Sequence, residues 1–239
     1  MRFFLLGLTL LVAACAGDEP PVLRDGTPGV DVADAALAAG LPQVALNVAN
    51  GVLANKPRNL EALRSQADAL AALEQRGEAE AAYSKLLATE PNLVPALIGL
   101  GRLRLHRDPA NAQILFQTAL QQEPRNTIAL NDLGITLDLQ GAHQAAQEAY
   151  RKALGLDPRS PAAQVNLALS MALSGRAAEA VGLLRPLAAD PDASPRVRQD
   201  LAAAMLLSGD PQGAARLLGR DLPPDQIETA LQALQALAP

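Results

Sequence analysis

Few residues of this chain have side chains suited to catalysis or metal binding. The chain contains one cysteine, Cys15, and two histidines, His106 and His143, among its 239 residues. His143 follows a glycine typical of a turn and is expected to be solvent-exposed, and His106 has the cations Arg104 and Arg107 beside it. The sequence has no HExxH, GxSxG or glycine-rich phosphate loop. We therefore predict a protein that is not an enzyme, holds no metal or cofactor and has no small-molecule substrate.

The single cysteine ends an apolar N-terminal segment, MRFFLLGLTLLVAAC. This segment is too short to span a bilayer, which needs about 20 residues, but one positive charge followed by an apolar run fits an export signal. Its ending resembles the lipobox of bacterial lipoproteins, which implies that residues 1–14 are a cleaved signal peptide and that Cys15 is acylated. A cleaved secretory signal with an incidental cysteine and a cytosolic protein with an apolar N-terminus are the alternatives.

The residues after Cys15 predict where the protein lies. By the same resemblance, Ala16 in place of Asp implies the outer membrane of a Gram-negative bacterium, with the protein facing the periplasm. Several acyl chains would anchor it more stably than one. Residues 15–30 are rich in Pro, Gly and charge and lack an apolar period, so we expect a flexible tether.

The rest of the chain repeats a unit of about 34 residues, most clearly from Thr127 to Ser160. The unit predicts two amphipathic helices joined at Gly141 and ended by Pro158. Every aromatic residue outside the apolar N-terminal segment falls at one position of the unit, which we call the aromatic slot: Tyr83, Phe116 and Tyr150. In the other three copies of the unit this slot holds Ala49, Leu184 and Leu218. Alanine stands four residues earlier in all six copies: Ala45, Ala79, Ala112, Ala146, Ala180 and Ala214. Closely crossing helices need small residues at the crossing, so this pattern favours stacked helical hairpins.

The order of residues within the unit resembles the tetratricopeptide repeat, or TPR. The resemblance rests on Leu133, Gly134, Gly141, Ala146, Tyr150, Ala153 and Pro158. The sequence departs from the family pattern at Leu130, where Trp is usual, and at Leu137, where Tyr is usual. The resemblance implies an all-α TPR solenoid of about six helix-turn-helix repeats over residues 31–222. It also implies a capping helix over residues 223–239.

Local signals predict where individual helices begin. Gly77 lies three residues later than the turn glycine of the unit, which predicts a longer first helix and a shorter second helix in the second repeat. A capping residue followed by proline predicts helix starts at Asp108, Ser160 and Ser194. The run from Asp225 to Glu228 predicts a capping box that opens the last helix.

A TPR array normally binds partners in a groove lined by the first helix of each repeat. Carried over position by position, the resemblance implies a groove formed by Arg64, Asp68, Ile98, Arg102, His106, Asn131, Ile135, Asp138, Val165, Leu169 and Leu173. Such a groove would be polar in its N-terminal half and apolar beyond Ile135, and would suit an amphipathic helix or extended segment of a partner. The alternative is that each residue only packs or solvates its own helix. No pair of basic residues accompanies Asn131 and Asn166, so we do not expect recognition of a free C-terminal carboxylate.

The net charge of −5 and the absence of a basic cluster argue against nucleic-acid binding. Residues 126–210, with the lipobox and the order of the repeats, resemble the TadD lipoprotein family of the Flp/Tad pilus-assembly system. That resemblance implies a noncatalytic periplasmic scaffold whose protein partner is a pilus-assembly component or the outer-membrane secretin. Two alternatives remain: a pilotin-like TPR lipoprotein of type IV pili or type II secretion, and a periplasmic scaffold for cell-wall enzymes.

Overall fold

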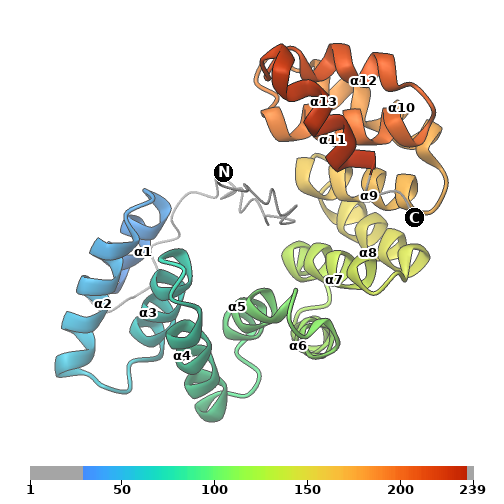
Figure 1. The fold of residues 1–239 in the computed structure, drawn as a ribbon. Helices are drawn as coiled ribbons and strands as arrows, with labels where there is room; N and C mark the ends of the chain where they lie inside the picture. The colour runs from blue at the N-terminus through green and yellow to red at the C-terminus, as the bar shows by residue number, and fades with distance from the viewer. Residues whose placement is uncertain (1–28, 236–239) are drawn as a thin grey trace. The chain divides into compact units, whose positions relative to one another are not determined.

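The computed structural model describes residues 29–235, and all of its regular structure is helical, with thirteen α-helices and no strand in that range. The predicted signal peptide of residues 1–14, the acylation of Cys15 and the tether before residue 29 lie outside the described residues. Within them, the prediction of an all-α TPR solenoid is confirmed (Figure 1).

The described helices fall into two compact units that meet within one helix, at Leu137. The first unit contains α1 (Val30–Ala38), α2 (Pro42–Asn55), α3 (Leu60–Ala72), α4 (Arg76–Thr89), α5 (Val94–Arg104) and α6 (Pro109–Gln122). Helix α7 (Thr127–Leu139) contains the boundary. The second unit contains α8 (His143–Leu156), α9 (Pro161–Leu173), α10 (Ala177–Ala189), α11 (Pro195–Leu207), α12 (Pro211–Leu218) and α13 (Pro224–Gln235).

Each unit is built from consecutive antiparallel hairpins. From α1 to α6 every helix packs against the next one, and the first helices of successive hairpins also meet, α1 against α3 and α3 against α5. The second unit repeats this arrangement from α8 to α12, with α9 against α11, and α13 closes it by packing on α11 and α12. First helices therefore form one continuous layer within each unit.

The repeating slots of the sequence are the core of the array. All six alanines of the crossing slot, from Ala45 to Ala214, are 0% exposed. Tyr83, Phe116 and Tyr150 are 3%, 0% and 1% exposed, and the aliphatic occupants of their slot are equally buried. A Cβ atom on Gly101 would lie 2.7 Å from the Phe116 ring, so the small residue on α5 is what admits this ring. The predicted equivalence of the three aromatic residues is confirmed.

The expected helix starts also appear. Asp108 accepts a hydrogen bond from the Asn111 backbone N–H at 3.1 Å, and Ser160 and Ser194 cap α9 and α11 in the same way. A proline follows each cap at the first helical position, where its missing N–H costs no intrahelical hydrogen bond.

The prediction for the second repeat is wrong. Helices α3 and α4 have 13 and 14 residues, the same lengths as α7 and α8, and Gly77 lies within the first turn of α4. The turn is made instead by Glu74, whose φ of 59° places it in the left-handed region that Gly141 occupies at 76° in the fourth repeat. Packing at the alanine crossing keeps the turn in register, and a residue with a Cβ accepts the strained conformation.

The start of the last helix also differs from the prediction. Helix α13 begins at Pro224, one residue before the expected cap Asp225, which lies in the first turn instead. Proline suits that first position because its φ is already helical. The predicted apolar face is present, since Ile227, Ala230, Leu231 and Leu234 are half-buried, while Leu237 lies outside the described residues.

Candidate partner-binding surface

The predicted groove residues lie along the first helices, as the repeat pattern implies. Arg64 and Asp68 are on α3, Ile98 and Arg102 on α5, and His106 just beyond the end of α5. Helix α7 carries Asn131, Ile135 and Asp138, and α9 carries Val165, Leu169 and Leu173. Among these residues, Arg64 and Asp68 are joined directly by an ion pair.

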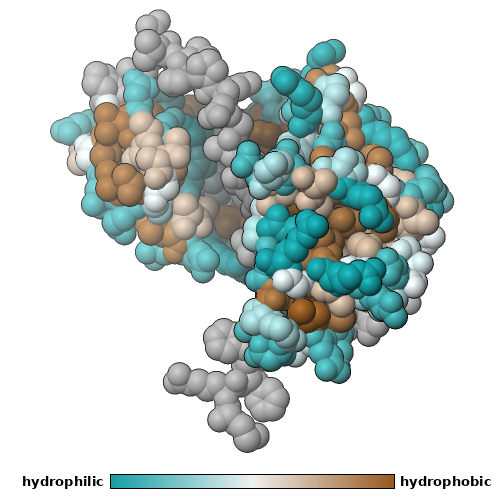
Figure 2. Space-filling view, turned by 90° about the horizontal axis from the view of Figure 1, so that it is seen from above, coloured by the Kyte–Doolittle hydropathy of each residue, from teal (hydrophilic) through white to brown (hydrophobic). Residues whose placement is uncertain are grey.

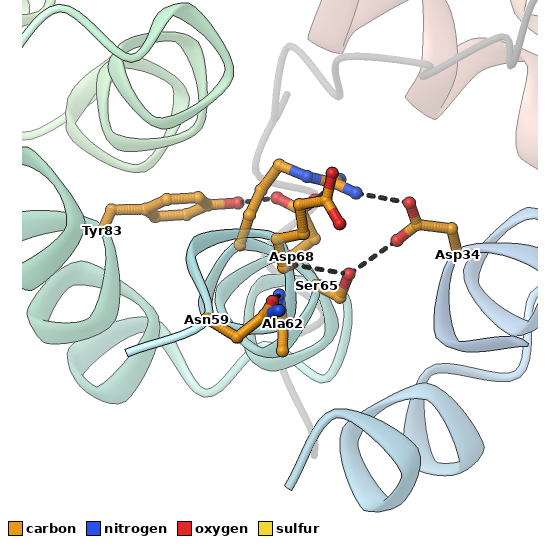
Figure 3. Close-up of polar contacts among 8 residues, drawn as sticks. Asp34, Asn59, Ala62, Ser65, Asp68 and Tyr83 are labelled. Atoms are coloured by element: carbon orange, nitrogen blue, oxygen red, sulfur yellow. Dashed lines mark hydrogen bonds and ion pairs between the residues drawn. The ribbon is translucent and has the colours of Figure 1, made fainter. Parts of the chain in front are cut away.

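In the first unit the polar residues bind one another across neighbouring helices (Figure 3). Arg64 forms ion pairs with Asp34 of α1 and, at 2.7 Å, with Asp68 of α3. Ser65 Oγ donates a hydrogen bond to Asp34 at 2.6 Å, and the Tyr83 hydroxyl donates to Asp68 at 2.5 Å. The network therefore joins α1, α3 and α4, and the charges expected to face a partner stabilise the array itself.

Burial determines the electrostatics of this network. Burial raises the pKa of Asp68, and Arg64 and the Tyr83 hydrogen bond oppose the rise. The pKa of Tyr83 is raised as well, first by burial and then by the adjacent carboxylate. Burial alone would lower the pKa of Arg64. The pKa is nevertheless raised, because the carboxylates of Asp68 and Asp34 stabilise the charged guanidinium. The pairing thus keeps a guanidinium charged among half-buried groups.

Another ion pair crosses from α5 to α7. Arg102 Nε donates to Asp132 Oδ2 at 2.6 Å, and the Asp132 side chain is 0% exposed while that of Arg102 is 34% exposed. Burial raises the pKa of Asp132, with Arg102 opposing. Its other oxygen, Oδ1, is buried and has no hydrogen-bond partner within the described part of the chain.

Sequence reasoning missed Asp132. The available signal was its register, because it occupies the repeat position of the buried Ser65 and of Gly99. In the later repeats the position is filled by Asn166 and Asp200, and Asp200 is buried and paired with Arg196, so a carboxylate here indicates that Asp132 has an arginine partner too. Arg102 is that partner.

In the second unit Asp138 is the centre of a third network. Its carboxylate accepts from the Tyr150 hydroxyl at 2.9 Å and from Ser170 Oγ at 2.7 Å, and it lies 2.8 Å from His143 Nδ1. The His143 side chain is 25% exposed, so the prediction of a solvent-exposed histidine is wrong. The Ser170 hydroxyl, which donates to the Asp138 carboxylate, also lies 3.2 Å from the main-chain oxygen of His143. These contacts tie α8 and α9 to the end of α7.

The predicted apolar part of the groove lies deeper than expected. Ile98, Ile135 and Val165 are buried at 8%, 5% and 9% exposure and contribute to the core. Leu169 and Leu173 on α9 are half-buried, and His106 is exposed. Among the predicted groove residues His106 is therefore the most accessible to a partner, and Leu169 and Leu173 present only part of their surface.

Exposed hydrophobic side chains also occur outside the predicted groove. The viewed face in Figure 2 carries hydrophobic patches among hydrophilic residues. The large apolar side chains that are most exposed are Val32, Leu41, Val44, Ile114, Ile128 and Leu183. The first three belong to the first hairpin, where a terminal repeat has no preceding neighbour within the described residues.

Residues 29–235 contain no group of three or more His, Cys, Asp or Glu side chains placed to hold a metal ion. No helix in the same range is long and apolar enough to cross a bilayer. Each unit therefore presents first helices joined by polar networks, and the second unit also presents the half-buried Leu169 and Leu173.

Solved structures with the same architecture have low sequence identity to this chain. PilW, described as a widely conserved type IV pilus biogenesis factor, superposes with a TM-score of 0.73 at 19% identity, over 87% of this chain and 96% of PilW. Pseudomonas aeruginosa pilF gives 0.71 at 17% identity, over 87% and 95% of the two chains. A thermophilic TPR protein from Thermus thermophilus gives 0.64 at 21% identity, over 74% and 97%. At these identities the similarity establishes the fold.

No curated protein sequence matches the chain. The tetratricopeptide repeat family matches residues 31–93, 98–161 and 140–194, which together span most of the described helices. The matched segments contain five of the six buried copies of the repeat, and the sixth, with Ala214 and Leu218, lies beyond residue 194. The chain belongs to the tetratricopeptide repeat family.

Proposed function

We propose that this protein is a noncatalytic TPR scaffold that assists the assembly of a Flp/Tad-type pilus or its outer-membrane secretin. It would hold a segment of a partner protein on its first-helix layer. The observation that carries the proposal is the TPR array itself, whose family binds protein partners. The likeness of residues 126–210 to the TadD family supplies the pilus system.

The polar networks suit such a scaffold because they fix the binding layer before a partner arrives. Arg64 and Asp34 connect α1 to α3, and Arg102 and Asp132 connect α5 to α7. A partner segment would therefore meet helices whose relative positions within the unit are already set. Preorganisation of this kind lowers the entropic cost of binding.

Acylation of Cys15 would place the scaffold at the outer membrane, facing the periplasm. The lipobox-like ending before Cys15 and the following Ala16 support this location. Fractionation of cells that express the Cys15→Ser variant tests the anchor. The variant should leave the membrane fraction, whereas retention there would argue against acylation and leave an ordinary secretory or cytosolic protein.

A type IV pilus or type II secretion role is the second candidate. The observation favouring it is the fold shared with PilW, described as a type IV pilus biogenesis factor, and with pilF. Both candidates predict a pilus or secretin component as the partner. They differ in which pilus system supplies that component.

Affinity capture from detergent-solubilised envelopes tests the function. The full chain should retain a secretin or pilus-assembly subunit after crosslinking, and mass spectrometry identifies whether that subunit is of the Flp/Tad or the type IV class. Retention of peptidoglycan synthases in place of these subunits would favour a scaffold for cell-wall enzymes and would contradict the proposal.

A further inference from the structure

We infer a second binding site in the second unit, a pocket between α10 and α12 that takes an acidic segment of a partner protein. The pocket has a volume of about 350 Å³. Its apolar lining comes from Leu201 and Met205 of α11 and Leu217 of α12. The helices that form it, α10, α11 and α12, pack consecutively in the same unit (Figure 1).

Three arginines surround this apolar lining. Arg185 comes from α10, Arg216 from the last turn of α12, and Arg220 from the residues just after it. All three side chains are exposed. An arginine guanidinium binds carboxylates through two parallel N–H donors, so three of them around one pocket form a site for acidic groups.

The arginines of the pocket differ from the other arginines of this region. Six arginines lie between Arg176 and Arg220. Three have a carboxylate partner, in the pairs Arg176–Glu179 at 2.6 Å, Arg196–Asp200 at 3.1 Å and Arg198–Asp221 at 2.6 Å. The side chains of Arg185, Arg216 and Arg220 form no ion pair or hydrogen bond within the range 29–235, although Arg220 interacts electrostatically with the neighbouring Asp221. The unpaired cations of the region are thus the ones that line the pocket.

The one carboxylate in the lining has another role. Asp210 caps α12 by accepting a hydrogen bond from the Gly213 backbone N–H at 2.8 Å. A side chain on Gly213 would overlap both Asp210 and the end of Met205, so the glycine permits this cap and the apolar lining together. Asp210 is therefore engaged in capping α12. Because the lining has three arginines and only this one carboxylate, the pocket has an excess of positive charge.

The combination of cations and apolar side chains selects the occupant. A free phosphate would use the arginines but would make no use of the apolar lining, in which Leu217 is half-buried and Leu201 and Met205 form the floor at 4% and 7% exposure. An anionic membrane surface would meet cations on an open face, whereas here they surround a concave space. A peptide with carboxylates beside a leucine-like side chain satisfies both parts, with the apolar group in the pocket and the carboxylates on the arginines.

Fluorescence anisotropy with the full chain in non-ionic detergent tests this site. The probe is the labelled peptide Gly-Asp-Leu-Glu-Glu-Leu-Leu-Asp-Gly, and its neutral counterpart has Asn and Gln in place of Asp and Glu. The acidic peptide should bind, and its affinity should fall about tenfold or more in the double variant R185Q/R216Q, which loses two charge-assisted contacts. Rising salt should weaken binding of the acidic peptide to the wild-type chain.

The exposed Arg159 supplies a matched control in the same unit. R159Q removes the same type of charge away from the pocket and should leave peptide affinity within about twofold, well short of the roughly tenfold loss expected of R185Q/R216Q. Thermal melting of each variant separates loss of the site from loss of the fold, and R185Q alone serves if the double variant melts early. Equal binding of the neutral peptide, unchanged affinity in R185Q/R216Q, or no binding of the acidic peptide would overturn the inference. Arginine-dependent binding to vesicles containing phosphatidylglycerol, without peptide binding, would assign the arginines to a membrane surface instead.

Discussion

The Tyr83 hydroxyl donates a hydrogen bond to Asp68 at 2.5 Å, so a residue of the buried aromatic slot reaches the polar network of the first-helix layer. The ring passes α5 at Gly99, where a Cβ atom would lie 2.7 Å from the hydroxyl oxygen. Core packing and the binding layer are therefore coupled through one side chain. A change at Gly99 should disturb both.

Gly99→Ala should destabilise the protein although alanine favours helix. The added methyl would overlap the buried Tyr83 ring, an overpacking that costs about 1–3 kcal/mol. Gly182→Ala in α10 is the matched control, because apart from its chain neighbours and the adjacent backbone of its own helix nothing lies within 4 Å of its Cβ position. That variant should gain about 0.5–1 kcal/mol from helix propensity alone. Urea unfolding of the two variants measures both effects, and equal gains in stability would show that Tyr83 is not held against α5.

Glu74→Gly should stabilise the protein. Glu74 has a φ of 59°, a conformation that costs a residue with a Cβ about 1–2 kcal/mol, whereas glycine adopts it freely. Glycine loses more conformational entropy on folding than glutamate does, which offsets part of this relief of strain. We therefore expect the free energy of unfolding to rise by about 0.5–1 kcal/mol. The reverse change, Gly175→Ala at a φ of 86°, should lower stability by a similar amount. Thermal unfolding checks the pair, and a loss of stability in Glu74→Gly would contradict the left-handed turn.

Asp132 should make stability depend on pH in a defined direction. Burial raises its pKa in the folded state above the unfolded value of about 3.9, so the folded chain binds the proton more tightly. Its stabilising contribution is complete below the unfolded pKa and is lost as pH rises through the folded pKa. The stability of Asp132→Asn relative to the wild type should therefore increase as pH rises from about 4. Urea unfolding across that range tests the slope.

The exposed Asp192 provides a variant of the same chemistry for the pH experiment. Asp192→Asn controls for the general effect of removing one negative charge from the chain. If Asp132→Asn and Asp192→Asn show the same pH dependence, the burial of Asp132 is not the cause.

Ala146→Leu should overpack the crossing in α8. Ala146 is 0% exposed, so a leucine there must displace its neighbours at a cost of about 1–3 kcal/mol. The adjacent Ala145 is exposed on the same helix, and Ala145→Leu should change stability by less than about 0.5 kcal/mol. Melting temperatures of the two variants compare the sites, and an unchanged value for Ala146→Leu would contradict the assigned register.

The repeat pattern predicted the fold because its signals are local and periodic. Alanine at every crossing and one aromatic slot define which faces meet, and the structure buries both sets. The pattern failed at Gly77 because it treated glycine as the marker of the turn. The structure shows that packing set the turn, and Glu74 accepted the strain.

The candidate surface was less predictable because its contacts join residues about 30 positions apart. Arg64 and Asp68 were predicted on a first helix, where they lie, but the pairing of Arg64 with Asp34 depends on how α1 packs against α3. Asp132 was missed since its partner Arg102 lies one repeat earlier. Sequence spacing predicts on which face of its helix a residue lies, but the packing of the helices decides whether that face can still contact a partner.

Site-specific photo-crosslinking in intact cells tests the central claim most directly, with benzoylphenylalanine in place of Leu173 on α9 or Leu183 on α10. Leu173 lies at the end of a first helix and is half-buried, while Leu183 is 43% exposed on a second helix. The scaffold account predicts that the Leu173 position crosslinks to a secretin or pilus-assembly subunit and that the Leu183 position does not. Crosslinks to that subunit from the Leu183 position alone would contradict binding on the first-helix layer.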